Sequence, residues 1–296
     1  EETECATHVV TKEAPSAERL MVALSPNDRI PNKDFVFRFR VAGEQMQSGL
    51  LSSRDERGGF FTLMFYPPKD LKQLTRKPLE MVFVLDSSGS MNGRPIAEAK
   101  KAIDRALCQL GPDDTFQMIN FSTTASQLGP NPICATPENV KLGLAYIGKL
   151  QGEGGTMMIE GIKAALDFPH DPERLRFVCF LTDGYIGNEA EILAAIQQKL
   201  GATRIFSFGI GSSVNRYLMD HMAKVGRGAV AYLGPNDSAA RIMDDFIERI
   251  RHPALTDLQF DWGGAKMMEV FPQRVPDLFV GRPVILTGRY SRGTGP

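Results

Sequence analysis

The middle of the chain alternates between two spacings of apolar residues. Short β-rich runs bounded by Gly, Pro, Asp or Asn predict strands, and the nearly continuous apolar character of 81–85 and 177–181 predicts that those two are central. The β-rich runs are 81–85, 114–122, 176–182, 203–211 and 229–233. Between them, apolar residues recur at intervals of three and four, as on one face of a helix, within 96–110, 140–147 and 190–200. Strands that alternate with helices form a mostly parallel sheet covered on both faces, so the pattern predicts a doubly wound α/β domain.

A short antiparallel edge strand near 125–128 would bring this predicted sheet to six strands. Outside the α/β region, both ends of the chain are strand-like without helices. The strand-like runs are 19–26, 34–42, 59–67, 255–262 and 283–290. Neither end has enough strands to close a core alone.

We therefore expect an α/β domain at 75–252, inserted into one β-sandwich-like domain. The flanks 1–74 and 253–296 would form the two halves of that domain, and the second half is expected to continue beyond the sequence given. No internal repeat is visible.

Charge and hydropathy remove two classes of partner. The chain has 34 basic and 35 acidic residues without a dense cationic run, which argues against nucleic-acid binding. Its longest apolar runs, such as 177–181, are far shorter than the roughly 20 residues needed to cross a bilayer, so no membrane insertion is expected in this segment. The sequence shows no signal peptide. The four cysteines lack zinc-site spacing and leave a disulfide between Cys108 and Cys134 open.

Oxygen-bearing side chains gather where the central strands stop. Two of the buried runs end in aspartate, Asp86 and Asp183. Ser88 and Ser90 follow the first aspartate, and Thr156 ends the Gly-rich stretch GEGGT. Because ligands of open doubly wound sheets bind beyond the carboxyl ends of the strands, we expect these side chains to share one crevice.

Two carboxylates and three hydroxyls suit a hard cation, which would be Mg²⁺ or else Mn²⁺ or Ca²⁺, and they do not suit zinc. If the hydroxyls bind directly and the carboxylates act partly through water, the ion keeps excess positive charge and an open position. An incoming carboxylate can fill that position. The pattern therefore predicts a docking point for an acidic side chain.

The motif DSSGSM, followed by GGT and TDG, resembles the metal-ion-dependent adhesion site of von Willebrand factor A domains. The resemblance covers roughly 78–250. The flanking stretches PNKDFVFRFRV and PDLFVGRPVILTGRY resemble the segments on either side of the A domain in inter-alpha-trypsin inhibitor heavy chains and their bacterial relatives. The resemblance implies a strand order 3-2-1-4-5-6 and an extracytoplasmic location, at a cell surface or in a periplasm.

The same resemblance implies a role for each site residue. Ser88, Ser90 and Thr156 would ligate the ion directly, whereas Asp86 and Asp183, on adjacent strands, would hold coordinating waters or bind the metal themselves. The Asp-Pro-His end through which vertebrate heavy chains attach to a glycosaminoglycan is absent from this sequence, so that activity is not implied.

The neighbours of the motif predict what surrounds the ion. Met91, Asn92, Met157 and Tyr185 would form a rim that selects among acidic ligands. Met157 and Met158 stand where relatives often carry a smaller polar residue, which would make the rim more apolar.

Three functions remain open at this point. The leading hypothesis is a non-enzymatic, divalent-metal-dependent, adhesion-type module that captures an Asp or Glu side chain of a protein partner. The alternative is a metal-dependent phosphoryl-transfer hydrolase with Asp86 as nucleophile. Against it, Ser88 stands where a haloacid-dehalogenase-type phosphatase has a second aspartate, and the sequence has no GxxxxGK[ST] phosphate loop. The third is a structural module with a vestigial site.

Overall fold

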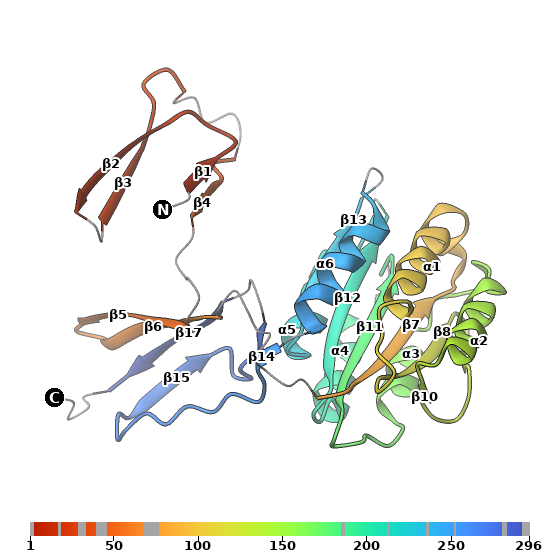
Figure 1. Ribbon diagram of the computed structural model, residues 1–296. Coiled ribbons are helices and arrows are strands. Elements are labelled where there is room, and N and C mark those ends of the chain that lie inside the picture. The colour runs from red at the N-terminus through yellow and green to blue at the C-terminus, as the bar shows by residue number, and fades with distance from the viewer. Residues whose placement is uncertain are drawn as a thin grey trace.

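The computed structural model describes most of the chain. The described residues are 3–16, 19–28, 34–39, 46–67, 77–184, 187–211, 213–234, 237–251, 253–279 and 283–291. An α/β unit is the largest part, a small antiparallel sheet lies beside it, and the N-terminal strands lie beyond that sheet (Figure 1).

The central sheet is mixed and has seven strands in the described part of the chain. They are β7 (Leu79–Asp86), β8 (Thr115–Phe121), β9 (Ala125–Gln127), β10 (Ile133–Cys134), β11 (Leu175–Thr182), β12 (Arg204–Ile210) and β13 (Val230–Leu233). Their order is β10-β8-β7-β11-β12-β13, with β9 also on β8. Only β9 and β10 run antiparallel to their neighbour. The predicted doubly wound order is confirmed.

The sheet has one strand more than predicted because its antiparallel edge is divided. β9 and β10 both pair with β8, and residues 128–132 lie between them. Pro130 and Pro132 fall in this gap, and proline cannot donate a ladder hydrogen bond, which accounts for the break.

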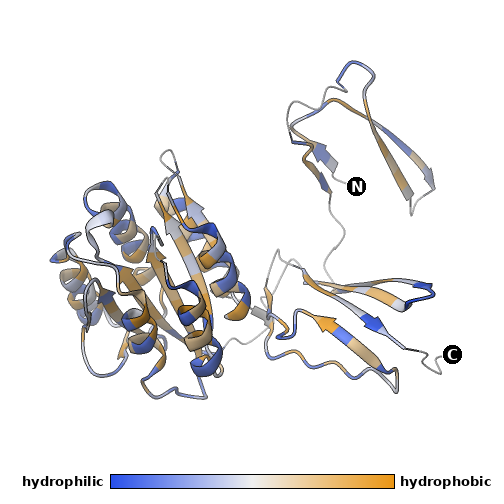
Figure 2. Ribbon diagram, turned by 180° about the vertical axis from the view of Figure 1, so that it is seen from behind, coloured by the Kyte–Doolittle hydropathy of each residue, from blue (hydrophilic) through white to orange (hydrophobic). Residues whose placement is uncertain are grey.

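Six α-helices cover the two faces of this sheet in the described residues. They are α1 (Arg94–Leu107), α2 (Pro137–Gly148), α3 (Met158–Leu166), α4 (Glu189–Lys199), α5 (Arg216–Val225) and α6 (Ala239–Arg251). Side chains of β7 alternate between two cores: Phe83 packs with α1, α2 and α6, whereas Val84 packs with α3, α4 and α5. The hydrophobic strands therefore lie between helices whose outer faces are hydrophilic (Figure 2).

The two flanks of the chain share one antiparallel sheet. It has four strands in the order β15-β17-β6-β5. Their bounds are Gln47–Asp55 for β5, Gly58–Tyr66 for β6, Met267–Phe271 for β15 and Val284–Tyr290 for β17. β6 and β17 pair from Phe65–Val284 to Gly59–Tyr290, so strands from opposite ends of the sequence lie side by side. The boundaries at residues 75 and 252 stay predictions.

The rest of the N-terminal flank pairs locally. β2 (Val10–Ser16) pairs with β3 (Arg19–Leu24), and β1 (Thr3–Cys5) pairs with β4 (Phe37–Phe39). In the described residues, the runs at 19–26 and 34–42 thus form ladders with the N-terminal strands and none with the C-terminal flank. The two flanks meet through β6 and β17.

The strand predicted at 255–262 is wrong. Only β14 (Pro253–Leu255) forms a ladder, with β16 (Leu278–Phe279). Asp257 has a φ of 52°, which is incompatible with a continuing strand. The apolar residues Phe260 and Trp262 nevertheless pack against the inner face of the four-stranded sheet. The alternating pattern therefore reflects packing of these side chains and not pairing in a strand.

The C-terminal flank is joined to the amino ends of the central strands. Arg204, at the start of β12, donates from Nε to Asp277 Oδ2 at 2.6 Å and from Nη2 to Asp277 Oδ1 at 3.0 Å. Both side chains are almost completely buried, with exposures of 2% and 0%. Phe279 adds ring contacts with Phe177 and Phe206, at centroid distances of 6.2 Å. This joint fixes the flank against the α/β unit.

Two further expectations can be compared with the structure. Cys108 and Cys134 are both free and exposed, so the disulfide that the spacing left open is not formed. Among the described helices, none is both long enough and apolar enough to cross a bilayer.

Candidate metal centre

Adjacent strands carry the two aspartates to the same end of the sheet. All eight residues of β7 are buried, and the strand ends at Asp86, which is 0% exposed. β11 pairs in parallel with β7 and ends one residue before Asp183. The backbone oxygen of Asp183 accepts a hydrogen bond from Asn215 N at 3.3 Å, which ties this loop to the start of α5.

Hydrogen bonds hold the carboxylate of Asp86 in one orientation. Its Oδ1 accepts from Ser88 N at 2.9 Å, and its Oδ2 accepts from the Thr182 hydroxyl at 2.5 Å. Burial raises the pKa of Asp86, the bonds from Ser88 and Thr182 oppose that shift, and the negative charge of Asp183 adds to it. A cation bound beside Asp86 would offset this repulsion and favour its charged form.

The two serine hydroxyls come from the turn that follows β7. Ser88 is buried and precedes the short 3₁₀ turn Gly89–Met91, in which Ser90 is exposed. The two Oγ atoms lie 3.2 Å apart. The buried hydroxyl of Ser88 and the hydroxyl of the exposed Ser90 therefore lie together in the turn after Asp86.

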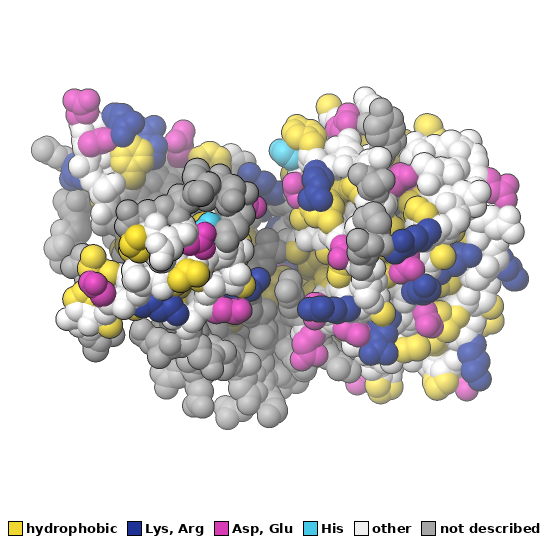
Figure 3. Space-filling view, turned by 90° about the horizontal axis from the view of Figure 1, so that it is seen from above, with side chains coloured by type: hydrophobic (Ala, Val, Ile, Leu, Met, Phe, Trp, Pro, Cys, Tyr) yellow, Lys and Arg dark blue, Asp and Glu magenta, His cyan; other side chains and the backbone are white. Residues whose placement is uncertain are grey.

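Thr156 lies on a loop that is bonded to the first one. Gly89 N donates to Gly154 O at 3.1 Å, and Glu153 N donates to Ser87 O at 2.9 Å. Thr156 is half-buried, directly before α3. The predicted site residues thus lie on three loops at the carboxyl ends of the strands. Seen from above, this side of the α/β domain intersperses acidic, basic and hydrophobic side chains over a largely uncharged polar surface (Figure 3).

The close approach of the loops depends on Gly152. A Cβ atom there would lie 2.4 Å from Asn92 N, which is closer than real contacts allow. We expect Gly152→Ala to separate Thr156 from the serines and to weaken Mg²⁺ or Mn²⁺ binding by about tenfold or more in calorimetric titration. Gly148→Ala is the matched control, since a Cβ at Gly148 would meet nothing within 4 Å. Equal affinities for the two variants would contradict this role.

A chain of side-chain hydrogen bonds, which sequence analysis missed, supports the first loop. The Tyr146 hydroxyl donates to Asn120 Oδ1 at 2.6 Å, Asn120 Nδ2 donates to Ser87 Oγ at 3.1 Å, and Ser87 Oγ donates to Phe121 O at 3.0 Å. Burial raises the pKa of Tyr146 to about 12, so its hydroxyl keeps its proton at neutral pH. The only signal in the sequence is a polar residue, Asn120, inside an apolar strand.

This chain links α2, which leads into the Thr156 loop, to the residue beside Asp86. Tyr146→Phe removes its first donor, and we expect metal affinity to fall by about tenfold while the metal-free protein stays folded. Tyr232→Phe is the control, because it removes a comparable hydroxyl that donates to Asp220 at 2.8 Å. Titration of both variants with Mn²⁺ tests the role, and unchanged affinity in Tyr146→Phe would refute it.

The donor set of the site suits a hard cation. Asp183 Oδ1 is buried and has no hydrogen-bond partner among the described residues, so this acceptor remains for an ion or a water bound to it. The described residues contain no group of three His, Cys, Asp or Glu side chains that could hold a metal, and the candidate site instead combines carboxylates with hydroxyls. All-oxygen donors of this kind fit Mg²⁺.

The predicted rim needs two corrections. Met158 is 1% exposed and packs in the core on the α3, α4 and α5 side, so it adds no apolar surface to the rim. Met91 is 0% exposed and packs in the core beneath α1, because the 3₁₀ turn directs it inward. Asn92 is exposed, and Met157 is 46% exposed. Tyr185 lies outside the described residues. The described rim therefore contains Asn92 and Met157.

Comparison with known proteins identifies the family. The family model of the von Willebrand factor type A domain matches residues 79–232, which is more than half of the chain. The chain belongs to the von Willebrand factor type A domain family. Domains of this family generally mediate protein–protein interactions and often bind a divalent metal.

Curated relatives contain the same region within longer chains. Human inter-alpha-trypsin inhibitor heavy chain H4 is 30% identical over 244 residues, which cover 78% of this chain and 26% of the relative. A von Willebrand factor A domain-containing protein of Dictyostelium discoideum is 27% identical over 273 residues, which cover 91% of this chain and 29% of the relative. The chain thus spans less than a third of these relatives.

Solved structures show the same fold at low identity. A von Willebrand factor type A protein from Catenulispora acidiphila matches with a TM-score of 0.60 and 18% identity, covering 86% of this chain and 67% of that chain. The ArnB paralog VWA2 from Sulfolobus acidocaldarius matches with a TM-score of 0.52 and 14% identity, covering 84% of this chain and 67% of that chain. Both matches extend beyond the von Willebrand factor A domain into its flanks.

Proposed function

We propose that this von Willebrand factor A domain is a divalent-metal-dependent binding module that captures an Asp or Glu side chain of a protein partner. The observation that carries the proposal is the buried Asp183 Oδ1, which lacks a partner among the described residues and lies beside a second carboxylate. The hydroxyls of Ser88, Ser90 and Thr156 complete an oxygen donor set that suits Mg²⁺, Mn²⁺ or Ca²⁺.

Each residue has a defined task in this proposal. Ser88, Ser90 and Thr156 hold the ion with neutral oxygens, whereas Asp86 and Asp183 contribute the charge, directly or through water. Each Asp86 oxygen already accepts one hydrogen bond and keeps a second lone pair for such a water. Because most of the ligands are neutral, the bound ion supplies positive charge that a partner's carboxylate can neutralise.

The hydrolase alternative is less well supported. A nucleophilic carboxylate needs an oxygen that can reach the substrate, but Asp86 is fully buried and both of its oxygens accept hydrogen bonds from Ser88 and Thr182. We therefore propose a non-enzymatic function. Likeness to an inter-alpha-trypsin inhibitor heavy chain supports an extracytoplasmic location.

Selection from a displayed peptide library tests the proposal. We expect peptides selected in Mg²⁺ to share an Asp or Glu, to dissociate in EDTA and to lose binding when that residue becomes its amide. Ser88→Ala should have the same effect as EDTA. Selected peptides that bind equally in EDTA and to Ser88→Ala would contradict the proposal. Hydrolysis of a generic phosphate ester that is lost in Asp86→Asn would favour the alternative.

A further inference from the structure

A second candidate site lies at the opposite end of the central strands. A groove of about 630 Å³ separates the end of α5 and residues 227–230 from the C-terminal flank. Its volume falls in the range of ligand sites, about 300–1,000 Å³. It continues into a neighbouring hollow that shares Lys224, Phe271, Pro272 and Arg274 with it.

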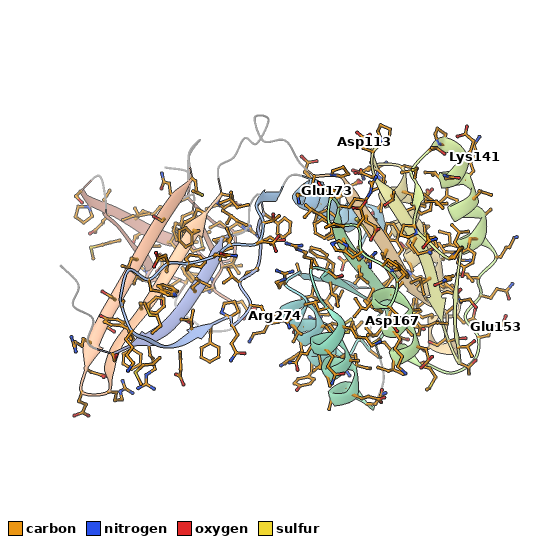
Figure 4. The ribbon with its side chains drawn as sticks, turned by 90° about the horizontal axis from the view of Figure 1, so that it is seen from below. Asp113, Lys141, Glu153, Asp167, Glu173 and Arg274 are labelled. Atoms are coloured by element: carbon orange, nitrogen blue, oxygen red, sulfur yellow. The ribbon has the colours of Figure 1, made fainter. Side chains whose placement is uncertain are left out.

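Three cations line this groove. Lys224 comes from α5, Arg227 from the turn after it, and Arg274 from the segment between β15 and β16. In the described parts of the chain, neither Lys224 nor Arg274 has a carboxylate at ion-pairing distance, and Arg274 Nη2 donates to Gln197 O at 3.3 Å. Figure 4 shows Arg274 where the flank meets the α/β domain.

Negative charge in and beside the groove is already engaged. Asp220 is the carboxylate among the lining residues, and its Oδ1 accepts the Tyr232 hydroxyl at 2.8 Å. Asp257, at the neighbouring wall, accepts from Arg204 at 3.0 Å and from Arg227 at 3.2 Å. Asp220 keeps its negative charge, and Arg227 pairs with Asp257. Lys224 and Arg274 therefore give the lining its surplus of positive charge.

Arg227 is held in an unusual conformation. Arg227 and Asp257 are the non-glycine residues with positive φ in the described chain, at 57° and 52°, and they are bonded to one another. Such conformations persist where the surrounding structure holds them. Arg227 Nε is enclosed and has no acceptor among the described residues. The side chain is thus a fixed cation that keeps an unused donor.

The opposite wall of the groove is apolar. Phe271 is 51% exposed and Ile285 is 45% exposed, although both line a concave surface. Pro272, Pro276 and Pro283 also belong to the lining and have no N–H to satisfy. This wall suits apolar side chains next to the charged wall.

We propose that this groove binds an acidic, partly apolar segment of another polypeptide. Lys224 and Arg274 pair with its carboxylates, while Phe271 and Ile285 contact its apolar side chains. A small inorganic anion would complement the charge but leave the apolar wall uncovered. The groove is at the amino ends of β12 and β13, whereas the metal centre is at the carboxyl ends, so the two sites share no residue.

The test uses the whole chain in EDTA, which removes any contribution of the metal centre. The probe is a short fluorescent peptide in which Glu alternates with Leu. Fluorescence anisotropy measures its binding. We expect binding that weakens with salt and falls by about tenfold in Lys224→Gln/Arg274→Gln. Lys141→Gln, an exposed cation on α2 far from the groove in Figure 4, should leave it unchanged. The same peptide with Gln in place of Glu should not bind.

Three results would overturn the proposal. The first is equal binding of the Glu peptide by all three proteins, or no binding at all. The second is displacement of the fluorescent peptide by inorganic phosphate at the same concentration at which the unlabelled Glu–Leu peptide displaces it. That result would identify a small-anion site. The third is a dimer of the unmodified chain that Lys224→Gln/Arg274→Gln abolishes, since a second copy would then occupy the groove.

Discussion

Replacing Asp277 with alanine is expected to lower the free energy of unfolding by about 3–5 kcal/mol. Arg204 is 2% exposed, and it donates two hydrogen bonds to a carboxylate that is 0% exposed. Without Asp277, the buried guanidinium keeps the backbone oxygen of Ala202 and one carboxylate, Asp257, whose side chain is 60% exposed. Urea unfolding of the whole chain measures the change.

The control for this prediction is Asp244→Ala. That substitution also removes the partner of an arginine, Arg105, but both side chains are well exposed, so a much smaller change is expected. If Asp277→Ala does not fold, Asp277→Asn retains one acceptor and should unfold at an intermediate urea concentration. Similar midpoints for Asp277→Ala and Asp244→Ala would show that the buried pair does not anchor the flank.

Millimolar Mg²⁺ or Mn²⁺ is expected to raise the melting temperature of the protein. A ligand that binds only the folded state stabilises it by about 2.7 kcal/mol at a hundredfold excess over its dissociation constant. Asp183→Ala should abolish the rise without unfolding the metal-free protein, because Asp183 Oδ1 has no hydrogen-bond partner to lose in the described chain.

Asp113→Ala is the matched control for the metal effect. Asp113 is an exposed carboxylate at the other end of the sheet, close to the start of β8, and its loss should leave the metal-induced rise intact. A melting curve of the unmodified protein that does not respond to Mg²⁺ or Mn²⁺ would count against the site, as would an undiminished rise in Asp183→Ala.

The parts of the fold that could be predicted depend on local patterns. The middle parts of β7 and β11, residues 81–85 and 177–181, are apolar at every position because both faces of these strands are covered. The motif residues are close in sequence or directly follow a strand, so their shared position followed from topology. The order of the strands came from the family resemblance and is confirmed.

The features that could not be predicted depend on contacts between distant residues. Arg204 and Asp277 are 73 positions apart, and nothing in the sequence pairs them. Tyr146, on α2, donates to Asn120, on β8, and nothing in the sequence pairs these two residues either. Met91 adjoins Ser90 in sequence, yet the tight turn between them sends one side chain into the core and the other to the surface.

We expect a divalent ion to bind Ser88, Ser90 and Thr156 and to keep one coordination position open for a carboxylate. Water-proton relaxation with Mn²⁺ measures both parts, since a bound ion that still exchanges water enhances relaxation and a ligand that replaces this water reduces it. We predict enhancement with the unmodified chain, a decrease on adding glutarate, and no enhancement with Ser88→Ala or Asp183→Ala. Relaxation equal to that of free Mn²⁺ with the unmodified chain, or an enhancement that survives both substitutions, would contradict the account.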